Sequence, residues 1–200
     1  MKKYLSWVYN PFTQLAGWKA FGIGFIILCL ATFVGYLGNT VFYGISIKTV
    51  QSVTLGNAFF LQFMGLAVTV LIMWATALVF AKHVRFQDIL GTITFAKYPL
   101  TPITFVIWLF NKPIENFTNK MLSIDLTNYN EIANLFTVFD YLLILLITIV
   151  IIPMFVWTIA LLFNAFRVST NLKGGKCILL FIAALLISEI LIMVILSVFS

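Results

Sequence analysis

The sequence ends in an apolar run, residues 177–199, that is long enough to cross a lipid bilayer and holds a single charged residue, Glu189. A bilayer core about 30 Å thick needs about 20 apolar residues in a helix. Because the run is continuous rather than alternating, it predicts a helix and not a strand of a barrel. Four earlier stretches have the same character: residues 19–36, 58–81, 89–110 and 135–166.

The composition supports the same class of protein. Charged residues make up 9% of the chain, whereas soluble domains carry about 25%, so the chain has too few charges to cover a surface in water. We therefore predict an all-α membrane protein, a five-transmembrane-helix bundle with kinked third and fourth helices. Residues 1–19 are predicted to form a cytoplasmic or interfacial aromatic lead-in, and residues 20–200 the membrane domain. The first apolar run is too long for a cleavable signal peptide.

Prolines predict where the helices are irregular. Pro99 and Pro102 each remove a backbone donor, so the third crossing is expected to break there, as either a full span or a re-entrant segment. Lys97, beside this break, is expected to face protein or to snorkel to the interface. In the fourth span Pro153 predicts a kink, and Asp140 is expected in a first turn near the interface.

The segments between the spans carry weaker signals. Residues 38–57 are predicted to be a connecting loop, in which the alternating segment 44–48 fits a short strand or hairpin. Residues 111–131 form the longest polar stretch, in which Asn128 and Glu131 fit a capping box for the next helix.

Small residues recur at four-residue spacing in and before the first span, as at Ala16, Ala20 and Gly24. This spacing is typical of close helix packing. The alternative is that small residues are simply frequent in membrane helices.

The basic residues predict the topology. Nine of the 12 Lys and Arg residues flank one predicted side of the membrane and three flank the other, and the side with the excess is expected to be cytoplasmic. The N-terminus is therefore predicted in the cytoplasm and the C-terminus outside. The nine are Lys2, Lys3, Lys19, Lys82, Arg85, Lys97, Arg167, Lys173 and Lys176, and the three are Lys48, Lys112 and Lys120.

Glu189 is the strongest candidate for a functional residue. A carboxylate at this depth costs several kcal/mol unless it is paired, hydrated or protonated. It therefore predicts a proton or cation site, an interhelical contact needed for assembly, or a protonated side chain bonded to a neighbour such as Asn164 or Ser188. Lys97 and Asp140 are the other candidate intramembrane residues.

The sequence predicts no catalytic, cofactor or metal site. The one histidine, His83, and two cysteines do not make a metal framework, and no catalytic motif is present, so an enzyme is not expected. Lys82, His83 and Arg85 are candidate lipid headgroup contacts. Because the basic residues lie at the edges of apolar runs rather than on one soluble surface, no nucleic-acid partner is expected.

The order of motifs resembles that of the Yip (Ypt/Rab-interacting protein) membrane family, in its bacterial form. The resemblance covers residues 10–198 and is carried by a proline-containing aromatic lead-in, basic edges, and the pattern Phe86-x3-Leu90-Gly91-x4-Ala96-x2-Pro99. It implies a five-helix membrane domain with a cytoplasmic N-terminus and no known catalysis. The eukaryotic branch is tied to Rab-type GTPases, but this chain lacks that branch's long N-terminal region and Asp-Leu-Tyr-Gly-Pro motif, so a GTPase partner is not carried over.

Two functions follow as hypotheses. The first is a bacterial inner-membrane protein that organises the membrane or scaffolds partners, with lipid, other membrane proteins or a second copy of itself as its contacts. The alternative is a transporter, channel or permease subunit that uses Glu189, because broken helices and buried charges line substrate paths.

Overall fold

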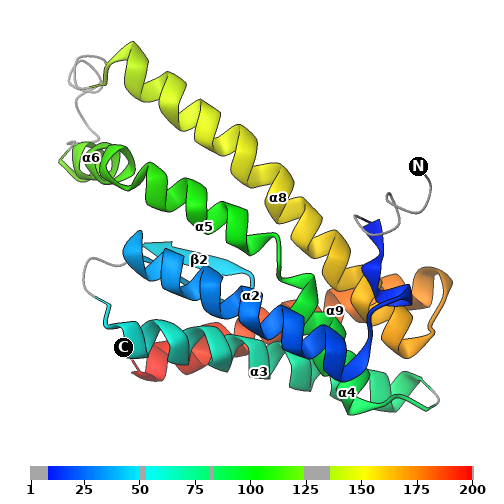
Figure 1. Cartoon of the computed structure of the whole chain (residues 1–200). Coiled ribbons are helices and arrows are strands. Elements are labelled where there is room, and N and C mark those ends of the chain that lie inside the picture. The colour runs from blue at the N-terminus through cyan, green and yellow to red at the C-terminus, as the bar shows by residue number, and fades with distance from the viewer. Residues whose placement is uncertain (1–8, 50–52, 82, 124–135, 200) are drawn as a thin grey trace.

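A computed structural model of the chain describes residues 9–49, 53–81, 83–123 and 136–199 (Figure 1). The described residues form long helices and one short hairpin. In chain order the elements are η1 (Pro11–Thr13), α2 (Gly17–Leu37), β1 (Thr40–Tyr43), β2 (Ser46–Thr49), α3 (Leu55–Phe80), α4 (Phe86–Ala96), α5 (Leu100–Leu109), α6 (Asn111–Leu122), α8 (Val138–Thr170) and α9 (Gly174–Phe199).

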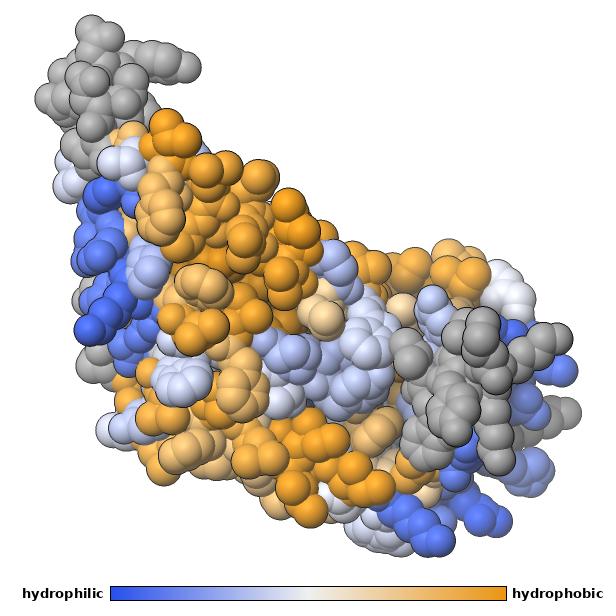
Figure 2. Space-filling view, turned by 45° about the horizontal axis from the view of Figure 1, so that its top comes forward, coloured by the Kyte–Doolittle hydropathy of each residue, from blue (hydrophilic) through white to orange (hydrophobic). Residues whose placement is uncertain are grey.

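Among the described residues, four helices are long and apolar enough to cross a bilayer: α2, α3, α8 and α9. A fifth crossing is possible if Phe86–Leu109 and Asn111–Leu122, which meet at a bend of 72°, act as one span. Figure 2 shows apolar surface between two ends where polar residues gather, which is the distribution that a bilayer selects. The chain is therefore a multi-pass integral membrane protein, as its composition predicts. The count of five, and the kink at Pro153 inside α8, stay predictions.

Small residues let α2 approach α4 closely. A Cβ atom on Gly24 would lie 2.6 Å from the backbone nitrogen of Phe95, and one on Gly91 would collide with the carbonyl oxygen of Gly17. Ala20 is fully buried in the same face, whereas Ala16 is exposed and precedes the helix. These contacts favour close helix packing as the interpretation of the small-residue spacing.

The helical run of residues 86–109 breaks where the prolines predict. α4 ends at Ala96, Lys97–Pro99 form a turn, and α5 begins at Leu100. Pro102 is tolerated because it lies in the first turn of α5, where backbone N–H groups have no helical acceptor. Because the helix is broken at this point, the Lys97 side chain lies inside the bundle.

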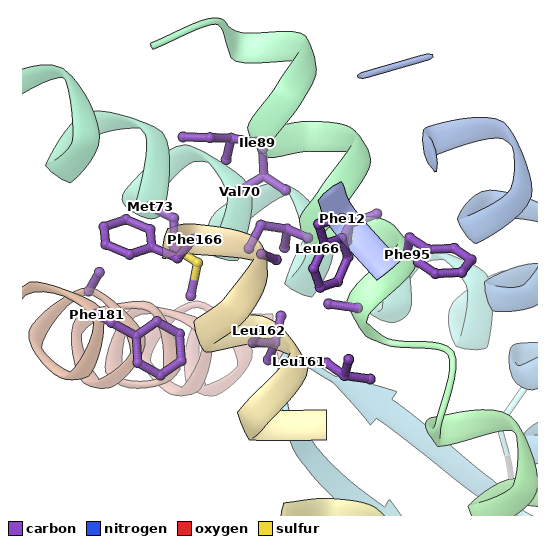
Figure 3. Packing of buried hydrophobic residues seen from close by; sticks show 14 of the residues in the cluster. Phe12, Leu66, Val70, Met73, Ile89, Phe95, Leu161, Leu162, Phe166 and Phe181 are labelled. Atoms are coloured by element: carbon purple, nitrogen blue, oxygen red, sulfur yellow. The ribbon is translucent and has the colours of Figure 1, made fainter. Parts of the chain in front are cut away.

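Two clusters of buried apolar residues hold the bundle together. The larger one joins η1, α2, α3, α4, α8 and α9, and includes Phe12, Met73, Phe95 and Phe166 (Figure 3). Phe12 is 1% exposed, so this part of the predicted interfacial lead-in belongs to the core. The smaller cluster joins Phe42 of β1 to Leu100, Ile103 and Ile107 of α5.

The predicted connecting loop of residues 38–57 contains a β-hairpin that turns into the bundle. β1 and β2 pair antiparallel, with Tyr43 opposite Ser46. Gly44 has φ +66°, the left-handed value that a type II′ hairpin turn requires at its first central residue. Val41, Phe42 and Ile45 are buried. The hairpin that the alternating segment 44–48 fits is thus present, and it is a small departure from the all-α fold class predicted for the whole chain.

The polar stretch predicted at residues 111–131 begins as a helix. α6 has an apolar and a polar face and no buried residue, as helices lying in the membrane interface do. The next helix starts with a capping box in which Thr137 accepts from the Asp140 N–H and Asp140 accepts from the Thr137 N–H. The predicted capping pair, Asn128 and Glu131, lies outside the described residues.

The helix ends separate the charges as the topology rule expects. α2, α4 and α9 begin, and α3 and α8 end, at one end of the bundle in Figure 1, whereas α6 lies at the other. We call these the basic end and the α6 end. The basic end carries Lys19, Arg85, Arg167, Lys173 and Lys176, and the α6 end carries Lys112 and Lys120.

Lys97 is buried inside the bundle at 1% exposure, so it faces protein, as one of the two expectations had it, and its place in the count of cytoplasmic basic residues was wrong. Without Lys97, eight basic residues flank the predicted cytoplasmic side and three flank the other side. Of the eight, Lys2, Lys3 and Lys82 lie outside the described residues. The direction of the charge asymmetry is unchanged.

Candidate functional site

The tip of the hairpin reaches deep into the bundle. A Cβ atom on Gly65 of α3 would collide with the backbone nitrogen of Gly44 and would lie 3.1 Å from Tyr43 Cα. Gly65 lies ten residues into α3, so the tip is about 15 Å from the start of that helix at 1.5 Å per residue. Non-helical backbone is tolerated at such a depth only inside protein or along a water-filled cavity.

Two charged side chains hold the turn of the hairpin. The Lys97 ammonium donates to the carbonyl oxygen of Gly44 at 3.1 Å. The backbone N–H of Ile45 donates to Glu189 Oε1 at 2.8 Å, and the Ser46 hydroxyl donates to Glu189 Oε2 at 3.0 Å. We call Lys97, Glu189 and the turn that they bind the hairpin clamp.

The clamp joins three parts of the chain that are distant in sequence. Lys97 comes from the break between α4 and α5, Glu189 from the middle of α9, and the turn from the loop after α2. The Gly44 carbonyl and the Ile45 N–H belong to one trans peptide unit, whose C=O and N–H point in opposite directions. The ammonium and the carboxylate therefore bind opposite edges of that unit.

This arrangement gives the buried ammonium of Lys97 and the half-buried carboxylate of Glu189 their partners. An isolated ion inside a bundle carries a desolvation cost of several kcal/mol. Here the cation meets the negative end of a peptide dipole and the anion meets its positive end, so each charge strengthens the hydrogen bond of the other. Both oxygens of Glu189 accept a hydrogen bond, which satisfies the carboxylate without a second charged residue in direct contact.

Gly44 has a steric role as well as a conformational one. A Cβ atom at this position would collide with Glu189 Oε1 and lie 2.8 Å from Ile192 Cδ1. The α9 helix therefore packs directly on the turn, and only a residue without a side chain leaves room for the carboxylate.

Comparisons of the chain with protein-family models, curated proteins and solved structures find no match. The geometry of the clamp and of the two ends is therefore what bears on its function. Within the described ranges, no three His, Cys, Asp or Glu side chains gather in a group that would hold a metal ion. Cys29 and Cys177 are free thiols.

The predicted partners of Glu189 were wrong. The Asn164 side-chain amide donates to the backbone carbonyl of Tyr9, and the Ser188 hydroxyl donates to the backbone carbonyl of Leu185. Asn164 is thus engaged with the lead-in and Ser188 with its own helix, whereas Glu189 turns toward the hairpin. The sequence contains one usable signal, the Gly44 turn in an alternating segment, but no local pattern connects that turn to α9.

Asp140 lies in the first turn of α8, away from the clamp. Its Oδ2 accepts from the Lys120 ammonium at 2.7 Å, and from the backbone N–H and the hydroxyl of Thr137, both at 2.9 Å. The ion pair connects α8 to the polar face of α6.

The predicted headgroup residues lie at the basic end. His83, with φ +62°, and Arg85 lie between α3 and α4, and Lys82 is outside the described residues. The Lys176 ammonium lies 5.5 Å from the ring centroid of Phe80, which places the start of α9 beside the end of α3. Contact of these side chains with lipid headgroups stays a prediction.

Proposed function

We propose that this chain is a non-enzymatic membrane protein of the Yip type, which organises the membrane or scaffolds partner proteins. The hairpin clamp is the observation that carries the proposal. Lys97 and Glu189 are engaged with the chain's own backbone, whereas side chains of a transport path must be free to exchange partners with a substrate. The clamp thus supports a fixed bundle rather than a moving one.

The lipid-facing surface supports a role in contacting other membrane components. α8 is the least buried of the four spanning helices, with 11% of its most apolar 18-residue window buried. Large apolar side chains such as Leu145 and Ile149 are more than half exposed there. In a bilayer this face meets either lipid or another helix.

Capture in mild detergent tests the scaffolding function. We expect the purified protein to retain a second copy or a membrane partner at defined stoichiometry. Ile149→Trp on α8 should weaken this association, whereas Ile26→Trp on α2 should not. Both isoleucines are 62% exposed, so the pair separates the α8 surface from a general effect of added bulk. A strictly monomeric, partner-free protein would contradict the proposal.

A transporter, channel or permease subunit is the second candidate. The break between α4 and α5, the tip of the hairpin and the charges of Lys97 and Glu189 lie at one depth. Transporters with discontinuous helices have this arrangement. In addition, Gln62 of α3 is 2% exposed and its Nε2 has no partner within the described ranges. Because a buried donor of this kind favours a bound water, it supports some hydration one turn from Gly65.

Flux in liposomes separates the two functions. If Glu189 carries a substrate or a proton, Glu189→Gln should abolish flux while the protein stays folded. Absence of flux in both the parent and the variant favours scaffolding.

We further propose a bacterial inner-membrane location with the N-terminus in the cytoplasm and the C-terminus outside. The excess of Lys and Arg at the basic end supports this orientation. His83 and Arg85 would then meet anionic headgroups of the cytoplasmic leaflet. A GTPase partner is not part of the proposal.

A further inference from the structure

A cleft of about 540 Å³ lies between α6 and the first turn of α8. It is lined by Pro113, Asn116, Asn119, Lys120 and Ser123 on the α6 side and by Phe139 and Asp140 of α8. Its volume is in the range of small-molecule sites in proteins, about 300–1,000 Å³. The cleft is separate from the hairpin clamp, and its lining combines one cation, one anion, neutral polar groups and the apolar side chains of Pro113 and Phe139.

The hydrogen bonds of the ion pair leave capacity on both charges. All three bonds that Asp140 accepts from described residues converge on Oδ2, so Oδ1 has no donor among them. The Lys120 ammonium has three donors, of which one is given to Asp140. The cleft therefore offers a carboxylate oxygen beside an ammonium group with further N–H donors.

The charges of Lys120 and Asp140 favour a zwitterion as the ligand of the cleft. A ligand with one charge would be attracted by one member of the pair and repelled by the other, whereas a ligand with a phosphate and an ammonium matches both. A primary ammonium also donates hydrogen bonds to a carboxylate oxygen, which a trimethylammonium group does not. The side-chain amides of Asn116 and Asn119 add donors for phosphate oxygens.

The position of the cleft favours a lipid as its ligand. α6 has the amphipathic character of an interfacial helix, and Figure 2 shows polar residues at this end of the molecule directly beside apolar surface. The apolar face of α8 starts in the cleft with Phe139, which is 70% exposed, and continues through Leu142 and Leu146. A headgroup in the cleft thus has its acyl chains next to this face.

We infer that the α6–α8 cleft binds the headgroup of phosphatidylethanolamine, with Lys120 and the neighbouring amides on the phosphate and Asp140 on the ammonium. The inference does not depend on the scaffolding function, because lipid binding is measured on the isolated protein. A failure of partner capture would leave it unaffected.

Native mass spectrometry of the full chain, in detergent with added lipid, tests the inference. Phosphatidylethanolamine, phosphatidylcholine and phosphatidylglycerol with the same acyl chains are compared. We expect the parent protein to retain phosphatidylethanolamine roughly tenfold better than phosphatidylcholine, since a hydrogen bond to a charged group contributes about 1.5 kcal/mol or more. Equal retention of these two lipids would overturn the inference.

Variants of the cleft assign the effect to its residues. Asp140→Asn keeps an oxygen for the Thr137 N–H but removes the negative charge, so the preference for phosphatidylethanolamine over phosphatidylcholine should vanish. Lys120→Gln should weaken retention of both lipids. Glu115→Gln is the matched control, because Glu115 is an exposed acid of α6 outside the cleft lining. An equal loss of preference in this control would contradict the assignment.

Two further measurements keep the test decisive. The thermal midpoint of each variant in detergent shows whether it is folded, and Lys120→Gln supplies a second readout if Asp140→Asn unfolds. Soluble phosphoethanolamine at the concentration of the lipid should not compete. Competition at that concentration would mean that the cleft binds a free metabolite and not a lipid.

Discussion

Lys97 and Glu189 bind opposite edges of the same peptide unit, between Gly44 and Ile45. The two residues are 92 positions apart in the sequence, and each comes from a different apolar segment. The peptide unit transmits the attraction between the two charges without direct contact between the side chains. Removing either charge is therefore expected to weaken the same turn.

The first prediction concerns Glu189. Glu189→Ala leaves the Ile45 N–H without its acceptor and Lys97 without its counter-charge, which should lower the free energy of unfolding by about 3 kcal/mol. Glu189→Gln keeps a carbonyl oxygen for that N–H and should lose less, about 1 kcal/mol. Reversible unfolding in detergent monitored by circular dichroism measures both values.

A double-mutant cycle with Lys97→Met tests the coupling of the two charges. If both residues act on one peptide unit, the combined variant should lose at least about 1 kcal/mol less than the sum of the single variants. Losses that add within error would show that the two residues act independently, contrary to the shared peptide.

The second prediction concerns the space at the turn. Gly44→Ala meets both an unfavourable positive φ and a collision with the Glu189 carboxylate and Ile192. Gly174→Ala is the matched control, since Gly174 has φ +67° but an added Cβ would have no neighbouring atom within 4 Å. We expect a loss of about 1 kcal/mol for Gly174→Ala and a larger one for Gly44→Ala. Equal thermal midpoints would mean that α9 does not press on the turn.

The apolar spans and the helix break could be predicted because each rests on local chemistry. Run length against bilayer thickness identifies α3 and α9, and the proline at residue 99 locates the end of α4. The ion partners could not be predicted in this way. The partner of Glu189 depends on a turn 144 residues away, and one sequence carries no signal for such a contact.

The depth of the hairpin in the bundle could not be predicted from the sequence either. The alternation of residues 44–48 is visible in the sequence, but alternation does not tell whether a strand lies outside the membrane or inside it. The deciding contacts are the approach of Gly65 to Gly44 and the burial of Lys97, and both depend on tertiary packing.

The third prediction tests the close approach of α2 and α4. Gly24→Ala forces a methyl group toward the Phe95 backbone, at 2.6 Å from its nitrogen, and the loss of unfolding free energy should be about 1–3 kcal/mol, as for overpacked cores. Gly22→Ala lies two residues away with no atom within 4 Å, so it should be neutral or stabilising through higher helix propensity. A similar loss in both variants would exclude the α2–α4 contact as the cause.

The fourth prediction places the hairpin and the two ends relative to the membrane. In a background with Cys29 and Cys177 replaced, Lys48→Cys and Lys112→Cys should react with a membrane-impermeant maleimide from the outside of intact cells. Lys176→Cys at the basic end should react only after the membrane is opened. Tyr43→Cys, beside the clamped turn, should stay unreactive in both conditions because the tip is enclosed by α3 and α9. Fast labelling at residue 43 would place the hairpin in water, and labelling of residues 112 and 176 from the same side would contradict a crossing of the membrane by α8.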